Sequence, residues 1–379
     1  MEFSYSREQE MVKKMLKEFA ETEIAPISEE IDAEAKYPYE TVAKLGELGI
    51  MGMPFPAEYG GAGSDYLTYI MAVEEISKVD ASHGVIVQTH NALCCWPIFT
   101  YGTEEQKEKY LPKLLSGEHL GAFGLTEPNA GTDAAMQQTT AKDMGDHWLL
   151  NGSKIFISGG GIADVYVVMA MTDKSKGNKG ISAFIVEKGM PGFSRGKKEN
   201  KMGIRGSIAA ELVFEDCIVP KENLLGQLGK GFKVAMSSLD VGRLGIAAQA
   251  LGIAQGAFDQ TVEYMKQRKQ FGRSLDRFQA LAFEMADMKT RIDGSRFLLY
   301  NAANRRDRGL SSTVEAAQAK LSCSETASYV VDKAVQFHGG YGYIKDYPVE
   351  RMYRDQKITE IYEGTSEVMK MVISGDIFK

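Results

Sequence analysis

The stretch Trp148-Leu149-Leu150-Asn151-Gly152-Ser153-Lys154-Ile155-Phe156-Ile157 separates two helical regions of the chain. An Asn-Gly pair between apolar, β-branched runs is a strong signal for a two-residue hairpin turn. Further short apolar or alternating runs lie at residues 165–171, 181–186 and 211–214, and no ten-residue helix fits between them. These runs predict a domain of antiparallel strands in the middle of the chain.

The regions on both sides of these strands carry the apolar spacing of amphipathic helices. Ser6 with Gln9 predicts a capping box for a first helix, whose apolar residues recur at helical spacing up to a stop near Pro26. On the C-terminal side, Ser312 with Glu315 predicts a second capping box. The chain is therefore predicted to be α+β, with an N-terminal helical domain (residues 1–120), a middle antiparallel β-barrel or sandwich domain (121–228) and a C-terminal helical domain (229–379).

The composition is that of an ordinary globular protein, with 44% apolar and 25% charged residues in a chain of 379. A formal net charge of -7 and the lack of a long basic block argue against a nucleic-acid partner. The sequence contains no run of 18 apolar residues, and its first residues lead into a charged amphipathic stretch without a signal or transit pattern. We therefore expect a cytoplasmic protein without membrane spans.

The cysteines give no sign of a metal site. Cys94, Cys95, Cys217 and Cys323 show neither C-x-x-C spacing nor a Cys/His cluster suited to zinc. This pattern favours a reducing compartment. The adjacent pair Cys94 and Cys95 is interpreted as core packing, because free cysteine packs as a small hydrophobe.

The glycines do not form a nicotinamide-binding motif. Gly226-x-x-Gly229-x-Gly231 lacks the spacing of the dinucleotide fingerprint and follows no βαβ unit. A P-loop is also absent from the sequence. An enzyme that moves hydride with this chain must therefore bind its carrier through another geometry.

The stretch Ile361-Tyr362-Glu363-Gly364-Thr365-Ser366-Glu367 has the layout of a reaction centre. A carboxylate between bulky apolar groups loses hydration, which raises its pKa and makes it a better proton acceptor near neutral pH. The glycine after Glu363 lets backbone and ligand approach closely. The alternative interpretation is a solvated glutamate on the surface, which is where most glutamates lie.

Four other segments appear together with this stretch, at residues 123–133, 154–158, 268–272 and 336–340. In order and spacing they resemble the acyl-CoA dehydrogenases, over essentially all 379 residues and closest to the short-chain, butyryl-CoA type. The resemblance implies a C-terminal four-helix bundle, FAD as cofactor and α,β-dehydrogenation of butyryl-CoA to crotonyl-CoA, or the reverse. It also implies electron exchange with electron-transfer flavoprotein and a homo-oligomer, most often a tetramer in the family.

The resemblance also implies roles for individual residues, with Glu363 as the base that removes the α-proton. The residues implied at the FAD from the same subunit or its active-site loop are Phe123, Leu125, Thr126, Gly131, Thr132, Phe156, Ser158, Thr365 and Glu367. Those implied at the FAD of a neighbouring subunit are Arg268, Phe271, Gln279, Gln336 and Gly340, with Gly339 beside them. Those implied at the substrate are Thr132, Asp240, Arg243, Tyr362 and Gly364.

Several of these residues also have simpler interpretations. The hydroxyls near Thr126 and Ser158 suit a β-domain edge that satisfies its own backbone, and Arg268 suits a solvated surface. Asp240 and Arg243 have the (i, i+3) spacing of a helical ion pair. Some family members carry the base at a position that corresponds here to Gly242, which has no side chain to act.

The acyl group is predicted from the stretch 81–100, which by resemblance borders the acyl tail. It contains no arginine to pair a distal carboxylate, which argues against glutaryl-CoA and favours a short uncharged chain. His83 and His90 in this stretch are interpreted as structural residues. Two alternatives remain: an acyl-CoA oxidase that passes electrons to oxygen, and a non-catalytic acyl-CoA or flavoprotein-binding scaffold.

Overall fold

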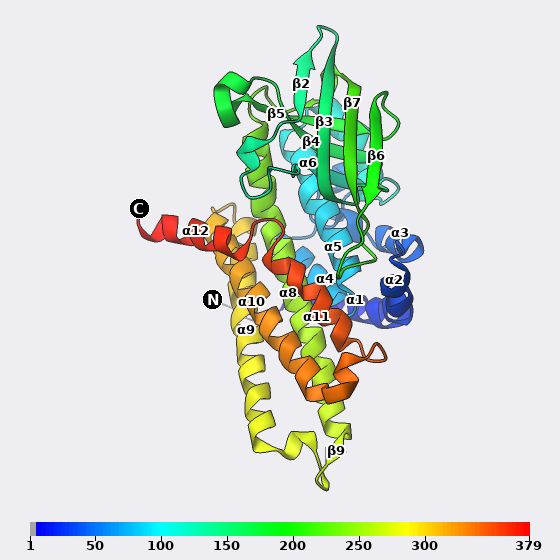
Figure 1. Cartoon of the computed structure of the whole chain (residues 1–379), viewed down its shortest axis with the longest axis vertical. Coiled ribbons are helices and arrows are strands. Elements are labelled where there is room, and N and C mark those ends of the chain that lie inside the picture. Colours follow the sequence, from blue (N-terminus) through cyan, green and yellow to red (C-terminus); the bar gives the residue numbers. More distant parts are fainter. Residues whose placement is uncertain (1–4) are drawn as a thin grey trace.

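The computed structural model describes residues 5–379. Residues 1–4 lie outside the described residues. The predicted N-terminal domain begins with them, and so does the stretch in which the sequence shows no signal or transit pattern. The predicted order of helices, sheet and helices is confirmed, and Figure 1 shows the sheet at one end of the molecule with long helices running away from it. The predicted α+β class, with helical regions on both sides of a β region, is therefore confirmed.

The N-terminal part consists of helices joined by short turns. Its helices are α1 (Arg7–Phe19), α2 (Ser28–Glu34), α3 (Tyr39–Glu47), α4 (Tyr66–Ser77), α5 (Ala81–Thr89), α6 (Trp96–Tyr101) and α7 (Glu104–Leu115). The predicted capping box is confirmed, since Ser6 Oγ accepts from Gln9 N and Gln9 Oε1 accepts from Ser6 N. The predicted stop near Pro26 is wrong. A π turn and then a 3-10 turn carry the chain from α1 into α2. Pro26 lies at the start of the 3-10 turn, where the backbone N–H that proline lacks would have no helical partner.

The middle part is an eight-stranded sheet. Its strands are β1 (Gly121–Gly124), β2 (Thr140–Asp143), β3 (His147–Ser158), β4 (Val165–Met171), β5 (Ile181–Glu187), β6 (Phe193–Lys198), β7 (Ala209–Pro220) and β8 (Leu224–Leu225). The strand order is β6-β7-β3-β2-β4-β5-β8, and β1 pairs with β4. Pairing is antiparallel except at β4, which lies parallel to β1 and to the start of β2.

The hairpin predicted at Asn151-Gly152 is wrong. Strand β3 runs without interruption through both residues, and the turn into it lies earlier, where Met144 N donates to His147 O at 3.0 Å. Asn151 instead binds across to β7, accepting from Asp216 N at 2.9 Å. Gly152 has φ +141°, and a side chain there would come within 2.7 Å of the Thr139 backbone. The pair therefore marks a close approach within the sheet.

The C-terminal part contains three long helices, of which α9 runs antiparallel to α8 and α10 (Figure 1). Its elements are α8 (Gly231–Gln267), β9 (Lys269–Gln270), β10 (Arg273–Ser274), α9 (Gln279–Asp307), α10 (Thr313–His338), α11 (Val349–Gln356) and α12 (Ser366–Ile377). The capping box predicted at Ser312 is wrong, because the Ser312 side chain makes no cap hydrogen bond. Its expected partner, Glu315, pairs with Arg305 Nε at 3.0 Å instead.

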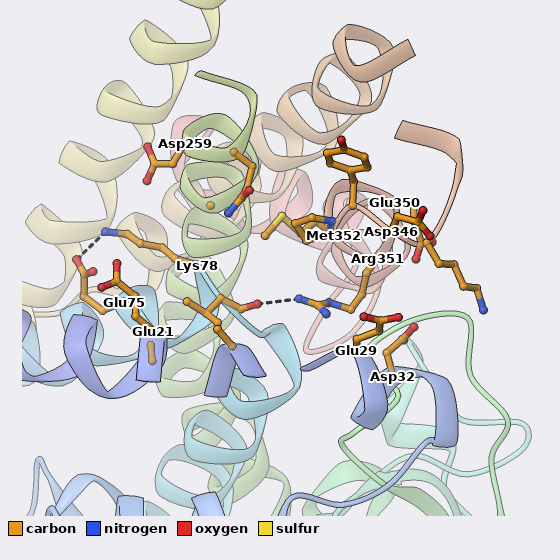
Figure 2. Close-up of a pocket in the computed structure, with 18 of the residues that line it drawn as sticks. Glu21, Glu29, Asp32, Glu75, Lys78, Asp259, Asp346, Glu350, Arg351 and Met352 are labelled. Carbon is orange, nitrogen blue, oxygen red and sulfur yellow. Dashed lines mark hydrogen bonds and ion pairs between the residues drawn. The ribbon is translucent and has the colours of Figure 1, made fainter. Parts of the chain in front are cut away.

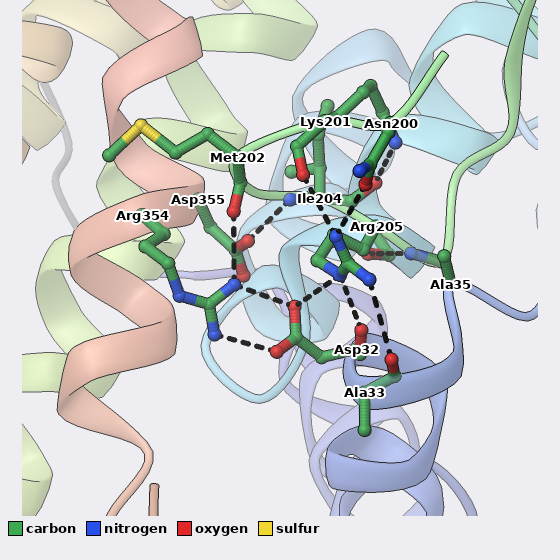
Figure 3. Close-up of polar contacts among 12 residues, drawn as sticks. Asp32, Ala33, Ala35, Asn200, Lys201, Met202, Ile204, Arg205, Arg354 and Asp355 are labelled. Atoms are coloured by element: carbon green, nitrogen blue, oxygen red, sulfur yellow. Dashed lines mark hydrogen bonds and ion pairs between the residues drawn. The ribbon is translucent and has the colours of Figure 1, made fainter. Parts of the chain in front are cut away.

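A polar junction ties the three parts of the chain together (Figure 3). Arg354 of α11 forms a bidentate pair with Asp32 of α2, at 2.6 and 2.9 Å. Arg205, from the loop before β7, donates to the Asp32 carbonyl oxygen at 2.6 Å, and Ile204 N donates to the Asp355 carboxylate. These contacts fix the sheet against both sets of helices. The N-terminal helices also share one apolar core with α8, α9 and α10.

Candidate active site

Glu363 lies on a strained turn between a 3-10 turn and the start of α12. Its φ is +52°, and that of Gly364 is +103°. A non-glycine residue in this region is uncommon, and such residues cluster at functional sites. The turn ends at Thr365, whose Oγ1 accepts from Val368 N at 3.3 Å and so caps α12.

The carboxylate of Glu363 lies directly over α8. A side chain built on Gly242 would overlap Glu363 Oε2 and would come within 3.1 Å of Leu93 Cδ2. The bare backbone at Gly242 therefore leaves the space that the carboxylate occupies. The position at which some members of the resembled family carry their base thus lies beside Glu363 in this fold.

Burial raises the pKa of the Glu363 carboxyl to about 7, from a usual value of 4.5. Three groups act against this desolvation. Gln88 of α5 donates through Nε2 to Glu363 Oε1 at 3.0 Å and to Oε2 at 3.3 Å, and the cations of Lys320 and Arg243 stabilise the ionised form. A group half ionised near neutral pH is suited to accept a proton and to return it.

Two cations also hold the backbone of this turn. The ammonium of Lys320, buried in α10, donates to the Gly364 carbonyl oxygen, and Arg243 Nε lies 3.5 Å from the Glu363 carbonyl oxygen. Arg243 forms the (i, i+3) ion pair with Asp240 at 2.6 Å that the sequence left as an alternative. The pair lies at the active-site turn, so an ion pair and a place in the site are compatible.

Tyr362 points to the other side of the turn. Its hydroxyl donates to Gln249 Oε1 of α8, and Gln249 Nε2 donates to the Ala81 carbonyl oxygen at 2.8 Å. This chain of hydrogen bonds joins the turn to α8 and to the start of α5. The residue before the carboxylate is therefore fixed by a side chain of α8 that is itself bonded to the backbone of α5.

The first group of residues predicted at a flavin gathers at the C-terminal end of β3, an interior strand, at one margin of the sheet. Ile155 N donates to the Thr126 carbonyl oxygen at 2.9 Å, which brings the 125–126 segment beside the end of β3. A register shift in β3 between Lys154 and Ile157 gives Phe156 a φ of +58° and leaves its ring 64% exposed. Ser158 is partly buried at the end of the strand, Phe123 and Leu125 are buried, and Gly131 and Thr132 are exposed.

A buried ion pair supports this margin of the sheet. Lys154 Nζ donates to Glu127 Oε1 at 2.7 Å, to the Leu125 carbonyl oxygen at 3.1 Å and to Gln137 Oε1 at 3.0 Å. Glu127 in turn accepts from Thr139 N at 3.0 Å. The loop that carries Thr126, Gly131 and Thr132 is thereby attached to the strand that carries Phe156.

The second predicted group lies around a cavity of about 520 Å³ near the β9–β10 hairpin. Arg268, Gln336, Gly339 and Gly340 line this cavity. A side chain built on either glycine would meet no atom within 4 Å, so their backbone is open to a ligand. A planar cation and open backbone N–H groups suit a phosphate-bearing ligand, so these residues fit the pyrophosphate half of FAD.

Two members of the second group lie outside the lining of this cavity. Phe271 at the hairpin tip is 94% exposed with φ +51°, and Gln279 is exposed at the start of α9. The two predicted groups also lie apart, because α8 is 37 residues long, or about 55 Å, and the sheet and the hairpin stand at opposite ends of the molecule (Figure 1). One chain does not bring them together.

Two further cavities lie elsewhere. One of about 600 Å³ is lined mostly by charged side chains from α1, α2, α8 and the segment before α11, and it contains none of the predicted site residues (Figure 2). Another of about 470 Å³ reaches Val241, the neighbour of Gly242, and includes Trp96. Arg306 of α9 also lines it, with its guanidinium 4.7 Å from the Tyr66 ring. Arg306 lies outside residues 81–100, the only stretch in which the sequence was expected to show an arginine for a distal carboxylate.

The residues interpreted as structural are satisfied by the fold. His83 pairs with Asp80 Oδ2 at 2.6 Å, and His90 Nε2 lies 2.9 Å from the Leu114 carbonyl oxygen. All four cysteines are free and buried, with Cys94 and Cys95 in the core. Among residues 5–379 no cluster of side chains could hold a metal ion, and no helix has the length and apolar character needed to cross a membrane.

Sequence reasoning missed three supporting residues. Gln88 stands in an apolar helical run, and Lys320 is a lone cation between an alanine and a leucine. Lys154 is the first residue of the 154–158 segment, but the sequence indicated no function for it. A polar residue within an apolar run was the available signal for Gln88 and Lys320. Their partners are far away in the chain, so that signal could not identify what they bind.

Comparison with known proteins gives matches along most of the chain. Family models described as the acyl-CoA dehydrogenase N-terminal, middle and C-terminal domains match residues 6–118, 122–217 and 229–378. A short-chain specific acyl-CoA dehydrogenase of Clostridium acetobutylicum is 61% identical over 379 residues, which cover 100% of both chains.

Solved structures agree with the sequence matches. Butyryl-CoA dehydrogenase of Megasphaera elsdenii superposes with a TM-score of 0.98 at 52% identity, with 100% of both chains covered. A structure described as the electron transferring flavoprotein of Acidaminococcus fermentans, in work on flavin-based electron bifurcation, gives a TM-score of 0.99 at 56% identity, again with 100% of both chains covered.

Proposed function

We propose, from the premise that this chain belongs to the acyl-CoA dehydrogenase family, that Glu363 is the base of a short-chain enzyme that interconverts butyryl-CoA and crotonyl-CoA. The chain is an FAD-dependent acyl-CoA dehydrogenase. The observation that carries the role of Glu363 is its desolvated carboxylate, with a pKa raised to about 7 and a place over the bare backbone of Gly242.

FAD, when bound, accepts the hydride that leaves the substrate β-carbon. For the isoalloxazine we propose the sheet margin formed by Leu125, Thr126, Phe156 and Ser158, together with Phe123, Gly131 and Thr132. The exposed ring of Phe156 offers an apolar surface to a flat ligand, and Thr126 and Ser158 offer hydroxyl groups beside it. Thr365 and Glu367, at the start of α12, are proposed to complete this site from the active-site turn.

The reaction requires that an α-proton leave the substrate as the β-hydride departs. We propose that a carboxylate oxygen of Glu363 takes this proton and that the cations Lys320 and Arg243 stabilise the ionised carboxylate. In the reverse direction the same group returns the proton. The backbone N–H of Glu363 is the proposed donor to the thioester oxygen, where negative charge develops. Asp240, Arg243, Tyr362 and Gly364 are proposed to contact the substrate around this turn, with Thr132 on the opposite side.

The second group of residues supports a shared cofactor site. Arg268, Gln336, Gly339 and Gly340 surround a cavity that fits a pyrophosphate, but α8 separates it from the sheet margin of its own chain by about 55 Å. We propose that this group, with Phe271 and Gln279, binds the FAD of a neighbouring subunit in a homotetramer. The exposed ring of Phe271 agrees with burial against a second chain.

Electron-transfer flavoprotein is the proposed redox partner. The support is the similarity to the Acidaminococcus structure, whose description concerns an electron transferring flavoprotein and bifurcation. The proposed chemistry of Glu363 serves both directions of the reaction. We propose the cytoplasm as the compartment, which the four free, buried thiols support.

The test is an anaerobic titration of the holoenzyme with butyryl-CoA, followed by flavin absorbance. We expect bleaching in the wild type, none in Glu363→Gln, and wild-type bleaching in Glu325→Gln, which changes a surface carboxylate paired with Lys370. Bleaching in Glu363→Gln would show that the base lies elsewhere. If the wild type fails to bleach, a chain-length series that includes glutaryl-CoA comes next, because Arg306 lines a cavity near the site.

Two further readouts separate the alternatives. Rapid reoxidation of the reduced flavin by air would favour an acyl-CoA oxidase. A purified protein that binds no flavin would favour a non-catalytic scaffold. We expect slow reoxidation in air and fast reoxidation by electron-transfer flavoprotein.

A further inference from the structure

Helix α8 presents two glycines, one turn apart, to the active-site turn and to α5. A side chain built on Gly242 would overlap Glu363 Oε2, and one built on Gly245 would overlap Gln88 Cγ and come within 3.1 Å of Gln88 Nε2. Glycine in a helix interior costs about 1 kcal/mol relative to alanine. The two glycines create a notch in α8 that holds the side chains of Glu363 and Gln88 together.

Within this notch the two side chains are in direct contact. Gln88 Nε2 donates to Glu363 Oε1 at 3.0 Å and to Oε2 at 3.3 Å, and it lies 3.0 Å from the Gly242 carbonyl oxygen. Gln88 is fully buried, and its Oε1 has no hydrogen-bond partner among the described residues. The amide nitrogen thus uses its hydrogens within the notch, on the Glu363 carboxylate and on the α8 backbone.

We propose that Gln88 is a positioning residue for Glu363, which holds the carboxylate over Gly242 by donating to its ionised form. The inference rests on the proposed role of Glu363 as the base. Because Gln88 Nε2 donates to Glu363 and to the Gly242 carbonyl oxygen at once, the amide fixes the carboxylate relative to α8.

Other charged or titratable groups face Glu363 from the surrounding elements. Lys320 comes from α10, Arg243 from α8, and Tyr66 and Tyr69 from α4. Both cations favour the ionised carboxylate, and burial opposes it. All four groups stay in place when Gln88 alone is changed. A shift in the titration of Glu363 in a Gln88 variant therefore reports the lost hydrogen bond.

The test compares Gln88→Met, which has a similar length and no amide, with Gln88→Glu, which keeps the shape and adds a second carboxyl group. The control is Thr261→Val, which removes a buried hydroxyl of α8 that bonds only to the Ala257 carbonyl oxygen. Each holoenzyme is assayed for kcat and KM against pH. The protonation of Glu363 is followed independently by infrared difference spectroscopy, with Glu363→Gln used to assign its band.

In Gln88→Met we expect the titration of Glu363 to move up by about one pH unit, because a hydrogen bond to the ionised form is lost. We expect kcat to fall about tenfold with little change in KM. The shift should be larger in Gln88→Glu, where two carboxyl groups share one notch, and absent in Thr261→Val. An unchanged Glu363 band and acid limb in both Gln88 variants would overturn the inference.

The outcome is separable from that of the proposed function. Loss of bleaching in Glu363→Gln together with an unmoved titration in Gln88→Met would overturn the inference alone. Retained bleaching in Glu363→Gln would overturn the role of the base and the inference with it. If Gln88→Met loses its flavin, Gln88→Leu takes its place, because it also lacks the amide and adds no charge to the notch.

Discussion

The two ends of α8 handle their functional residues in different ways. Near Gly242, Glu363 is surrounded by groups from this same chain, and Gln88, Arg243 and Lys320 are all buried. At the far end, Arg268 faces an open cavity, and the rings of Phe271 and Tyr343 are 94% and 88% exposed. The first end is complete in one chain, and the second end has the surface of a site that another chain completes.

Proton transfer and cofactor binding thus lie at different places along α8. Proton transfer requires a carboxylate held to within a fraction of an ångström in a desolvated site, which a single folded chain provides best. Binding a long cofactor between subunits requires open backbone and cations, which can remain solvated until the subunits meet. The predictions below test each end separately.

The largest effect is expected from Gly242→Ala. The added methyl group would overlap the end of a flexible side chain, so the fold should persist while the Glu363 carboxylate is displaced. We expect kcat to fall about 10³-fold, since general base catalysis is worth about 10²–10⁴-fold. The matched control is Gly294→Ala in α9, where the new methyl group would meet no atom within 4 Å.

Gly294→Ala should keep full activity and be slightly more stable, as expected for a helical glycine replaced by alanine. The measurements are steady-state kinetics with butyryl-CoA and thermal unfolding of both variants. Wild-type kcat in Gly242→Ala would show that the base does not need the space over α8. It would contradict the claim that Gly242 fixes the position of the Glu363 carboxylate.

A smaller effect is expected at the open end, from Arg268→Gln. Loss of a cation that binds phosphate should weaken FAD binding about 100-fold, or about 3 kcal/mol. Arg268 lies over the Tyr341 ring, with its guanidinium carbon 5.4 Å from the ring centre. The control is Arg291→Gln, because that guanidinium lies over the Tyr329 ring in the same way, at 4.2 Å, but outside the cavity. Flavin retained after gel filtration, together with the molar mass, is the measurement. Equal retention in both variants would remove Arg268 from the cofactor site.

The sequence predicted what local patterns determine. The Ser6 capping box is confirmed because both of its partners lie within one turn. The order of helical and strand regions is confirmed because periodicity extends over many residues. The prediction of a Ser312 capping box is wrong because Glu315 pairs with Arg305, in the preceding helix, and not with the backbone of Ser312. The Asn151-Gly152 hairpin failed because Asn151 pairs with Asp216 across the sheet.

The active site divides in the same way. Glu363 was found because its immediate neighbours signal a desolvated carboxylate. Gln88 was missed because it lies 275 residues from Glu363 in the chain, and only the fold brings the two together. Lys320 was missed for the same reason, since its partner is the carbonyl oxygen of Gly364. Sequence motifs identify the reacting group more readily than the groups that hold it.

The smallest effect concerns Asp355, which tests whether a raised pKa marks a reaction centre. Burial, with Asp80 nearby, raises the pKa of Asp355 to about 7, the same value as for Glu363, yet Asp355 accepts from Ile204 N at the junction in Figure 3. Its unfolded pKa is 3.8, so the folded protein binds the extra proton between about pH 4 and pH 7. The stability due to Asp355 is therefore present below about pH 4 and lost as the pH rises through about 7.

Asp355→Asn keeps the acceptor for Ile204 N and cannot ionise. Relative to this variant, the wild type should lose about 2 kcal/mol of unfolding free energy between pH 5 and pH 8, a factor of about 30 in the unfolding constant. Denaturant unfolding of both proteins at the two pH values measures this difference, and kcat at pH 8 should be the same in both. A variant that folds normally but loses kcat would place Asp355 in the reaction. If the wild type and Asp355→Asn show the same pH dependence of stability, Asp355 is ionised in the folded protein. Of the two carboxyl groups compared, only Glu363 would then have a raised pKa.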